Sequence, residues 1–201
     1  MKRGPLILLV LLVVGALLGF LAASILRDGL SARSTPTTME AMMARKVRHL
    51  SIPASARAQQ DPVAASEENL RDARVHFADH CAICHGNDGS GDTMIGRGLY
   101  PKPPDLRLDE TQKLSDGELF WIIENGVRFT GMPAFSGHGM QDDSWKLVRF
   151  IHHLPQLTAE ERLEMERYNP KGLDDRQEEQ QEDDFLNGAT PVPKPESHHQ
   201  R

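Results

Sequence analysis

The chain opens with a long uninterrupted run of apolar residues. Residues 5–26 carry no charge and are rich in Leu and Val. As an α-helix these residues would extend for about 33 Å, enough to cross the hydrocarbon core of a bilayer. We therefore expect residues 1–26 to form an N-terminal transmembrane helix. A cleaved signal peptide is the alternative, since residues 22–24 (Ala-Ala-Ser) suit a peptidase. Its apolar core would normally be shorter, about 7–15 residues.

Residues 27–66 are mostly polar and are predicted to form a flexible tether. One patch within them has apolar residues at helical spacing, which predicts a short amphipathic helix with a basic opposite side. Its apolar members are Met39, Met42, Met43, Val47 and Leu50, and its basic members are Arg45, Lys46, Arg48 and His49. Two interpretations are open: a helix on the membrane surface, or a transient helix in a linker.

Residues 67–157 have the pattern of a small helical domain. Ser66 suits the N-cap of a helix over residues 67–84, in which Leu70, Ala73 and Phe77 form one apolar stripe. A glycine-rich and then proline-rich stretch follows, over residues 86–104.

Two further helices are expected in this domain. One begins at the capping box of Ser115 and Glu118 and extends through residues 119–125. The other covers residues 142–154 and ends before Pro155. No segment alternates in the manner of a strand, so we predict an all-α fold. A core of this size is marginal alone, and a buried cofactor would enlarge it.

Residues 158–201 are expected to contribute one short helix and an acidic tail. Thr158 and Glu161 form another capping box. Residues 158–184 hold eleven acidic and four basic side chains, and residues 170–201 are predicted to be disordered. His198 and His199 are interpreted as part of this loose tail rather than as metal ligands.

The two cysteines of the chain lie in one motif, Cys81-Ala82-Ile83-Cys84-His85. C-x-x-C-H is the attachment signature of a c-type haem. The two thiols add across the haem vinyl groups, and the adjacent histidine ligates the iron. A zinc site would need further Cys or His ligands near by, and a redox dithiol would accompany βαβ patterning. Neither is visible, so the motif predicts one covalently attached haem c.

The net charge and the site of haem attachment limit the possible partners and the cellular location. The net charge is −6, which argues against nucleic acid as a partner. The positive charges that flank residues 5–26 leave the orientation ambiguous. Haem attachment takes place outside the bacterial cytoplasm, however. We therefore expect a single-pass protein of the bacterial inner membrane with its haem domain in the periplasm.

The iron needs a second axial ligand, or its sixth position stays open to small molecules. The downstream candidates are Met94, Met132, His138 and Met140. Met132 stands between Gly131 and Pro133, which predict a fixed bend that can aim a thioether. The other candidates lack such a frame.

Residues 67–157 resemble a class I cytochrome c domain, with the matching segments in the family's order. These segments are Ala73-x-x-x-Phe77-x-x-x-Cys81, Cys84-His85-Gly86-x-x-Gly89-x-Gly91, Pro103-Pro104-Asp105-Leu106, residues 114–120, Ile123-x-Asn125-Gly126, Gly131-Met132-Pro133-Ala134-Phe135 and Trp145-x-x-Val148-x-Phe150-Ile151. One departure is Ala73, where many relatives have glycine.

The resemblance implies a role for each site residue. Cys81 and Cys84 would carry the thioether bonds, while His85 and Met132 would ligate the iron. The backbone carbonyl of Pro104 would accept a hydrogen bond from the His85 ring. The helix that begins after Ser66 would cross the last helix of the domain.

These features predict a non-enzymatic electron carrier. Iron held by histidine and methionine exchanges one electron and has a raised potential. We expect a membrane-anchored cytochrome c that shuttles electrons between a donor and an acceptor protein. The alternatives are a subunit of a larger membrane oxidoreductase, or a gas sensor or peroxidase-type site if Met132 does not bind iron.

Overall fold

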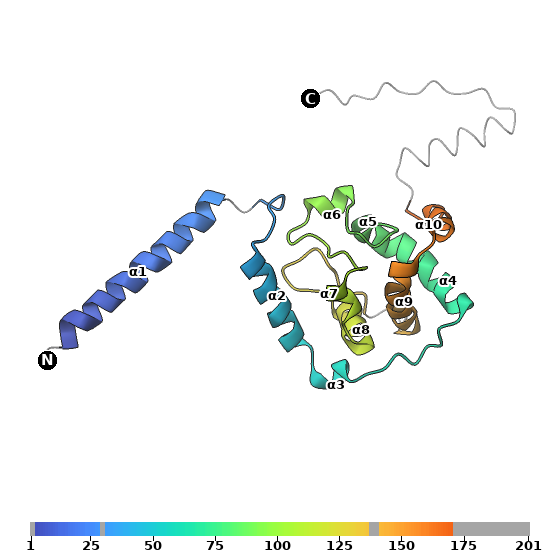
Figure 1. The fold of residues 1–201 in the computed structure, drawn as a ribbon, viewed down its shortest axis with the longest axis horizontal. Coiled ribbons are helices and arrows are strands. Elements are labelled where there is room, and N and C mark those ends of the chain that lie inside the picture. Colours follow the sequence, from blue (N-terminus) through green and yellow to red (C-terminus); the bar gives the residue numbers. More distant parts are fainter. Residues whose placement is uncertain (1–2, 29–30, 137–140, 171–201) are drawn as a thin grey trace, which may run out of the picture.

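The computed structural model describes residues 3–28, 31–136 and 141–170. This part of the chain is helical and contains no strand, which confirms the all-α prediction (Figure 1). The predicted tail, apart from Pro170, lies outside the described residues. The α-helices are α1 (Arg3–Asp28), α2 (Thr38–Ser51), α3 (Ala54–Arg57), α4 (Glu67–His76), α5 (Ala82–His85), α6 (Met94–Gly98), α7 (Asp109–Gln112), α8 (Asp116–Asn125), α9 (Gln141–His153) and α10 (Ala159–Glu166).

The apolar run near the N-terminus forms α1, which extends away from the globular unit (Figure 1). Its window Ile7–Ser24 is long and apolar enough to cross a membrane, and none of that window is buried by the rest of the structure. A core helix of a soluble protein would be largely covered. This exposure is consistent with a membrane anchor.

The core lies where α4 crosses α9. Ala73 and Phe77 from the α4 side are buried, as are Val148 and Phe150 of α9. The rings of Phe77 and Phe150 lie 5.2 Å apart between centroids. Burial of such side chains contributes roughly 1.5–3 kcal/mol each. The crossing of the first and last domain helices is thus present, and Ala73 is accommodated within it.

The helix expected over residues 67–84 is not continuous. α4 ends at His76, and a wide π-helical turn spans Phe77–Cys81 before α5 begins. Ala82 N–H donates to the Phe77 carbonyl in this turn. The apolar spacing gave no sign of this turn, because the predicted stripe of Leu70, Ala73 and Phe77 ends where the turn begins. Turns of this kind are frequent at functional sites.

α8 and α9 are joined by an aromatic stack and a partly buried hydrogen bond. The rings of Phe120 and Trp145 lie parallel with 3.9 Å between their centroids. Ser144 Oγ of α9 donates to the Glu124 carboxylate at 2.6 Å. The predicted capping box of α8 is present, with Glu118 N–H donating to Ser115 Oγ at 3.2 Å.

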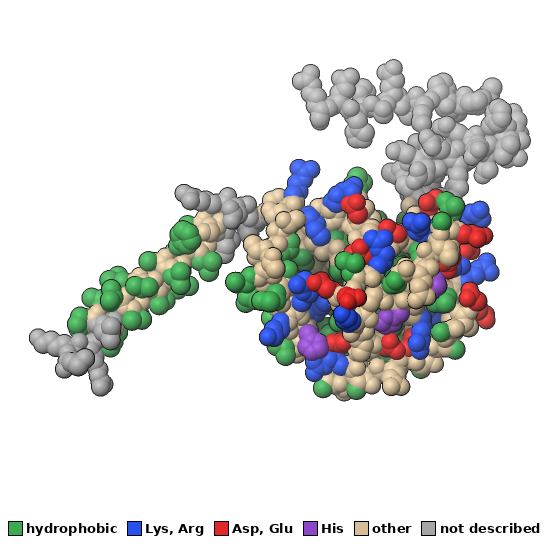
Figure 2. Space-filling model, viewed as in Figure 1, with side chains coloured by type: hydrophobic (Ala, Val, Ile, Leu, Met, Phe, Trp, Pro, Cys, Tyr) green, Lys and Arg blue, Asp and Glu red, His purple; other side chains and the backbone are tan. Residues whose placement is uncertain are grey.

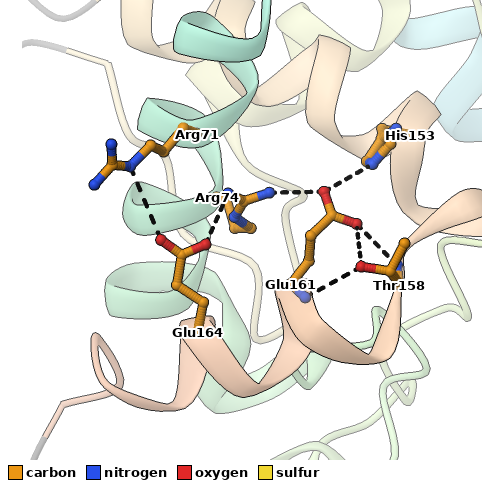
Figure 3. Close-up of polar contacts among 6 residues, drawn as sticks. All are labelled: Arg71, Arg74, His153, Thr158, Glu161 and Glu164. Atoms are coloured by element: carbon orange, nitrogen blue, oxygen red, sulfur yellow. Dashed lines mark hydrogen bonds and ion pairs between the residues drawn. The ribbon is translucent and has the colours of Figure 1, made fainter.

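α10 folds back onto α4 and carries a buried methionine, Met165. Arg74 of α4 donates to Glu161 at 2.7 Å and to Glu164 at 2.8 Å, and His153 also contacts Glu161 (Figure 3). The side chain of Arg74 is largely shielded from water, so these pairs are screened less than surface pairs are. The capping box at Thr158 is also present.

The segment that precedes α4 also lies against the globular unit. Arg149 of α9 donates to the backbone carbonyls of Asp61 and Val63, both at 3.1 Å. Ser115 Oγ donates to the Arg57 carbonyl at 3.0 Å, and Ile52 is buried. The sequence predicted a flexible tether over residues 27–66, and in this structure Arg57, Asp61 and Val63 of that range contact the globular unit. These hydrogen bonds use backbone carbonyls, of which the residue types of the segment give no sign.

Gly117 of α8 permits the close contact with α3. A Cβ at this position would lie 2.0 Å from the Ala56 backbone oxygen, which cannot move aside as a flexible side chain would. We expect Gly117→Ala to lower the free energy of unfolding by about 1–3 kcal/mol, despite the better helix propensity of alanine. The measurement is a urea titration of the detergent-solubilised protein.

Gly98→Ala is the control for this substitution, because a Cβ at Gly98 meets open space. Its stability should change by less than about 0.5 kcal/mol. Equal effects of the two substitutions would show that α3 does not pack on α8 as described.

Candidate functional site

The C-x-x-C-H motif lies on the short helix α5 and the turn before it. Cys81 is the N-cap residue, and Cys84 and His85 occupy the last two positions of α5. Both cysteines are free thiols and are partly buried. A separation of three residues places the two side chains on one side of a helix. The turn therefore presents two sulfurs to a single ligand, next to an imidazole.

The environment of the thiols does not favour ionisation. Burial raises the pKa of Cys81 to about 12, with a smaller contribution from neighbouring Cys84. Burial also raises the pKa of Cys84. A reactive redox dithiol is usually associated with the opposite shift. Within the described residues, moreover, no cluster of three or more His, Cys, Asp or Glu side chains could hold a metal ion.

His85 is partly buried, and its ring lies 6.5 Å from that of Phe77. Burial lowers the pKa of His85, and hydrogen bonding to the Pro104 carbonyl opposes this shift. Nδ1 is buried and makes no hydrogen bond of good geometry with any described residue. The Pro104 carbonyl is a candidate acceptor for Nδ1, and such a bond would leave Nε2 for a metal.

The chain folds back directly after α5. Gly91 N–H donates to the His85 carbonyl at 2.7 Å, and Leu106 N–H donates to the Gly89 carbonyl at 2.8 Å. Gly91 has φ +75°, and a Cβ there would lie 2.7 Å from the Pro103 oxygen. These contacts bring the proline segment to the histidine.

Thr93 is a site residue that sequence reasoning missed. Its hydroxyl donates to the Ile83 carbonyl at 2.8 Å and accepts from Gly96 N–H at 2.8 Å. It thus caps α6 and satisfies a carbonyl of α5 at the same time. A threonine three residues before the capped N–H is the ordinary N-cap signal. Here that signal was hidden among glycines.

Met132 lies on a separate loop between α8 and α9 and is half-buried. Its N–H contacts Thr130 Oγ1 at 3.1 Å, and its carbonyl accepts from Val127 N–H at 3.1 Å. Gly126 has φ +64°, and a Cβ there would lie 2.7 Å from the Met132 oxygen. The loop is therefore held by its own hydrogen bonds.

The other ligand candidates are placed less favourably or are not described. Met94 stands at the start of α6 with 81 % of its surface exposed, in no position to reach a buried group without movement. His138 and Met140 lie outside the described residues. Met132 is thus the candidate in a half-buried, structured setting.

These residues fit a covalently attached haem. Two adjacent thiols would become thioethers, which do not ionise, so their raised pKa values carry no penalty. The unsatisfied Nδ1 of His85 has a carbonyl close by to fix the ring. Hydrogen bonds of this type, from the ring nitrogen that does not bind the metal, orient metal-ligating histidines.

One protein-family model matches part of the chain. Residues 68–151 match the family model described as cytochrome C oxidase, cbb3-type, subunit III. The match extends from α4 to α9 and includes Cys81, Cys84, His85, Pro104 and Met132. No curated protein matches the chain.

Thr93→Val tests the hydrogen bonds that join α5 to the glycine-rich stretch. The substitution leaves the Ile83 carbonyl and the Gly96 N–H without their partner. We expect a loss of about 1–3 kcal/mol in the free energy of unfolding, measured by urea titration of the haem-loaded protein. Thr93→Ser keeps the hydroxyl and should stay within about 0.5 kcal/mol of wild type. Equal losses in both variants would indicate that packing of the methyl group, not hydrogen bonding, matters here.

Proposed function

We propose that this chain, whose residues 68–151 form a c-type cytochrome domain with one covalently bound haem c, is a membrane-anchored one-electron carrier. The observation that carries the proposal is the α5 turn, where two thiols three residues apart adjoin a histidine with an unsatisfied Nδ1. When bound, the haem supplies an iron that alternates between the ferric and ferrous states.

In this proposal the protein residues hold and tune the iron. Cys81 and Cys84 fix the haem to α5. His85 would hold the iron, with its ring oriented by the Pro104 carbonyl. Met132 would be the second ligand, positioned by the hydrogen bonds of its loop. A soft thioether favours the ferrous state and raises the potential. With His85 and Met132 both bound, small molecules would be kept from the iron.

The location of the chain follows from α1 and the haem. α1 would cross the bacterial inner membrane, and the haem domain would lie on the periplasmic side, where haem c is attached. Residues 67–157 hold fourteen acidic and nine basic side chains. Donor and acceptor proteins should therefore present basic surfaces, and their association should weaken as the salt concentration rises.

A second candidate function is a subunit of a larger oxidase complex. The matched family model is described as an oxidase subunit, which favours this role. The electron chemistry would be the same in both cases. Co-purification of a stoichiometric partner after mild detergent extraction would favour the subunit, and isolation of the chain alone in active form would favour the shuttle.

Met132→Ala tests the axial ligand. The oxidised variant should lose the weak sulfur-to-iron absorption band at the red end of the visible spectrum, and the reduced variant should bind carbon monoxide readily. Met94→Ala is the matched control and should keep the band and exclude carbon monoxide. An unchanged band in Met132→Ala would transfer the ligand role to another residue. Ready binding of carbon monoxide by the wild type would favour a gas-binding site instead.

A further inference from the structure

α2 is a well-formed helix rather than a transient one. Its fourteen residues would extend over about 21 Å. Thr37 and Glu40 form a capping box, in which Glu40 N–H donates to Thr37 Oγ1 at 3.3 Å and Thr37 N–H donates to Glu40 Oε2 at 3.4 Å. Of the two interpretations left open by the sequence, a helix on the membrane surface and a transient helix in a linker, the capped helix fits the second less well.

The side of α2 that faces the globular unit is polar. Arg45 pairs with Glu110 of α7 at 3.2 Å, and His49 contacts the Glu118 carboxylate of α8 at 2.7 Å. Tyr100 also donates a hydrogen bond to Glu40. The polar side of the helix is thus already engaged with the rest of the chain.

The apolar side of α2 faces outward. No described residue covers it, and Figure 2 shows hydrophobic side chains gathered over α2 on the side toward α1. A helix that only packed on the domain would be expected to turn this side inward. The exposed fractions are 68 % for Met39, 56 % for Met42, 58 % for Met43, 64 % for Val47 and 72 % for Leu50.

Lys46 lies on this apolar side, although the sequence pattern placed it with the opposite basic residues. It is four residues after Met42, three after Met43 and four before Leu50, and such neighbours share one face of a helix. An isolated lysine is costly to bury in an interface between proteins unless it is paired. At a lipid surface its stem can lie along apolar groups while its amine reaches the phosphates.

We propose that the apolar face of α2 lies in the headgroup region of the same bilayer that α1 crosses. Only residues 29–37 separate the two helices, nine residues that span at most about 30 Å. The apolar face therefore cannot move far from the membrane surface. An amphipathic helix of this type is immersed by about 5–10 Å. A second copy of the chain is a poorer occupant, because paired faces would bury Lys46 beside Lys46.

This arrangement restricts how the haem domain sits at the membrane. α2 would be held by lipid on one side and by α7 and α8 on the other, through the Glu110 and Glu118 contacts. The domain would keep one side toward the bilayer instead of rotating freely on a tether. The inference concerns orientation and goes beyond the proposed electron transfer.

The test uses the full chain in nanodiscs of phosphatidylethanolamine and phosphatidylglycerol. A nitroxide label is attached at Met43→Cys, and the matched control carries it at Ala44→Cys, which is exposed on the same turn but about 100° away from Met43. The native cysteines are thioether-bonded in the proposed haem protein and do not react. Collision rates are measured with oxygen, which partitions into lipid, and with a water-soluble nickel chelate.

We expect the ratio of oxygen collisions to chelate collisions to be several-fold higher for the label at position 43 than for the label at position 44. Adding Met42→Gln and Leu50→Gln should shift position 43 toward the control values. Equal chelate accessibility at both positions would place the face in water and overturn the proposal. Protection of position 43 from both reagents would indicate coverage by protein and would also overturn it. Neither result tests electron transfer. The membrane contact of α2 can therefore be disproved while the proposed electron-carrier function stands.

Discussion

The hydrogen bond from Gly91 N–H to the His85 carbonyl, 2.7 Å long, is the contact on which the arrangement of the site depends. It turns the chain back immediately after the attachment motif. Because Gly91 has no Cβ, the Pro103 backbone can approach closely, and Pro104 reaches the His85 ring. Thr93 strengthens the same junction from the Ile83 side. A loop that diverged here would leave the imidazole without an orienting carbonyl.

Much of the fold was predictable because it rests on local signals. The capping boxes at Ser115 and Thr158 and the apolar stripe of the helix after Ser66 depend on residues three or four apart, which the sequence displays directly. The π-helical turn at Phe77–Cys81 was not predictable, since the apolar stripe ends where the turn begins. The docking of residues 52–63 was missed for a different reason. The Arg149 side chain, for example, donates to the backbone carbonyls of Asp61 and Val63, and every residue carries such a carbonyl.

The candidate site also combines features that the sequence displays with features that depend on tertiary contacts. The C-x-x-C-H motif and the Met132 loop were evident from residue types, and the matched family model covers both. Thr93 was not evident, because its importance comes from a carbonyl ten residues earlier in the chain. The orientation of α2 was also hidden. The amphipathic pattern identified the two faces, but only the polar contacts with Glu110 and Glu118 show which face turns outward.

Membrane attachment by α1 and surface contact by α2 would together bear on how the haem domain exchanges electrons. A domain held with one side toward the bilayer exposes a fixed remaining surface, which suits partners that are themselves embedded in the same membrane. This geometry is compatible with a carrier and with a subunit of a larger complex. In either case the haem carries the electron, and attachment to α5 would keep it next to His85.

The central claim is therefore that the haem is bonded covalently through Cys81 and Cys84. The most direct measurement is a haem stain on a denaturing gel, run on protein made in a host that attaches haem c. The account predicts that the wild-type band keeps its haem under denaturing conditions and that the Cys81→Ala/Cys84→Ala variant loses it. A wild-type band that loses its haem on denaturation, or a double variant that keeps it, would contradict the account.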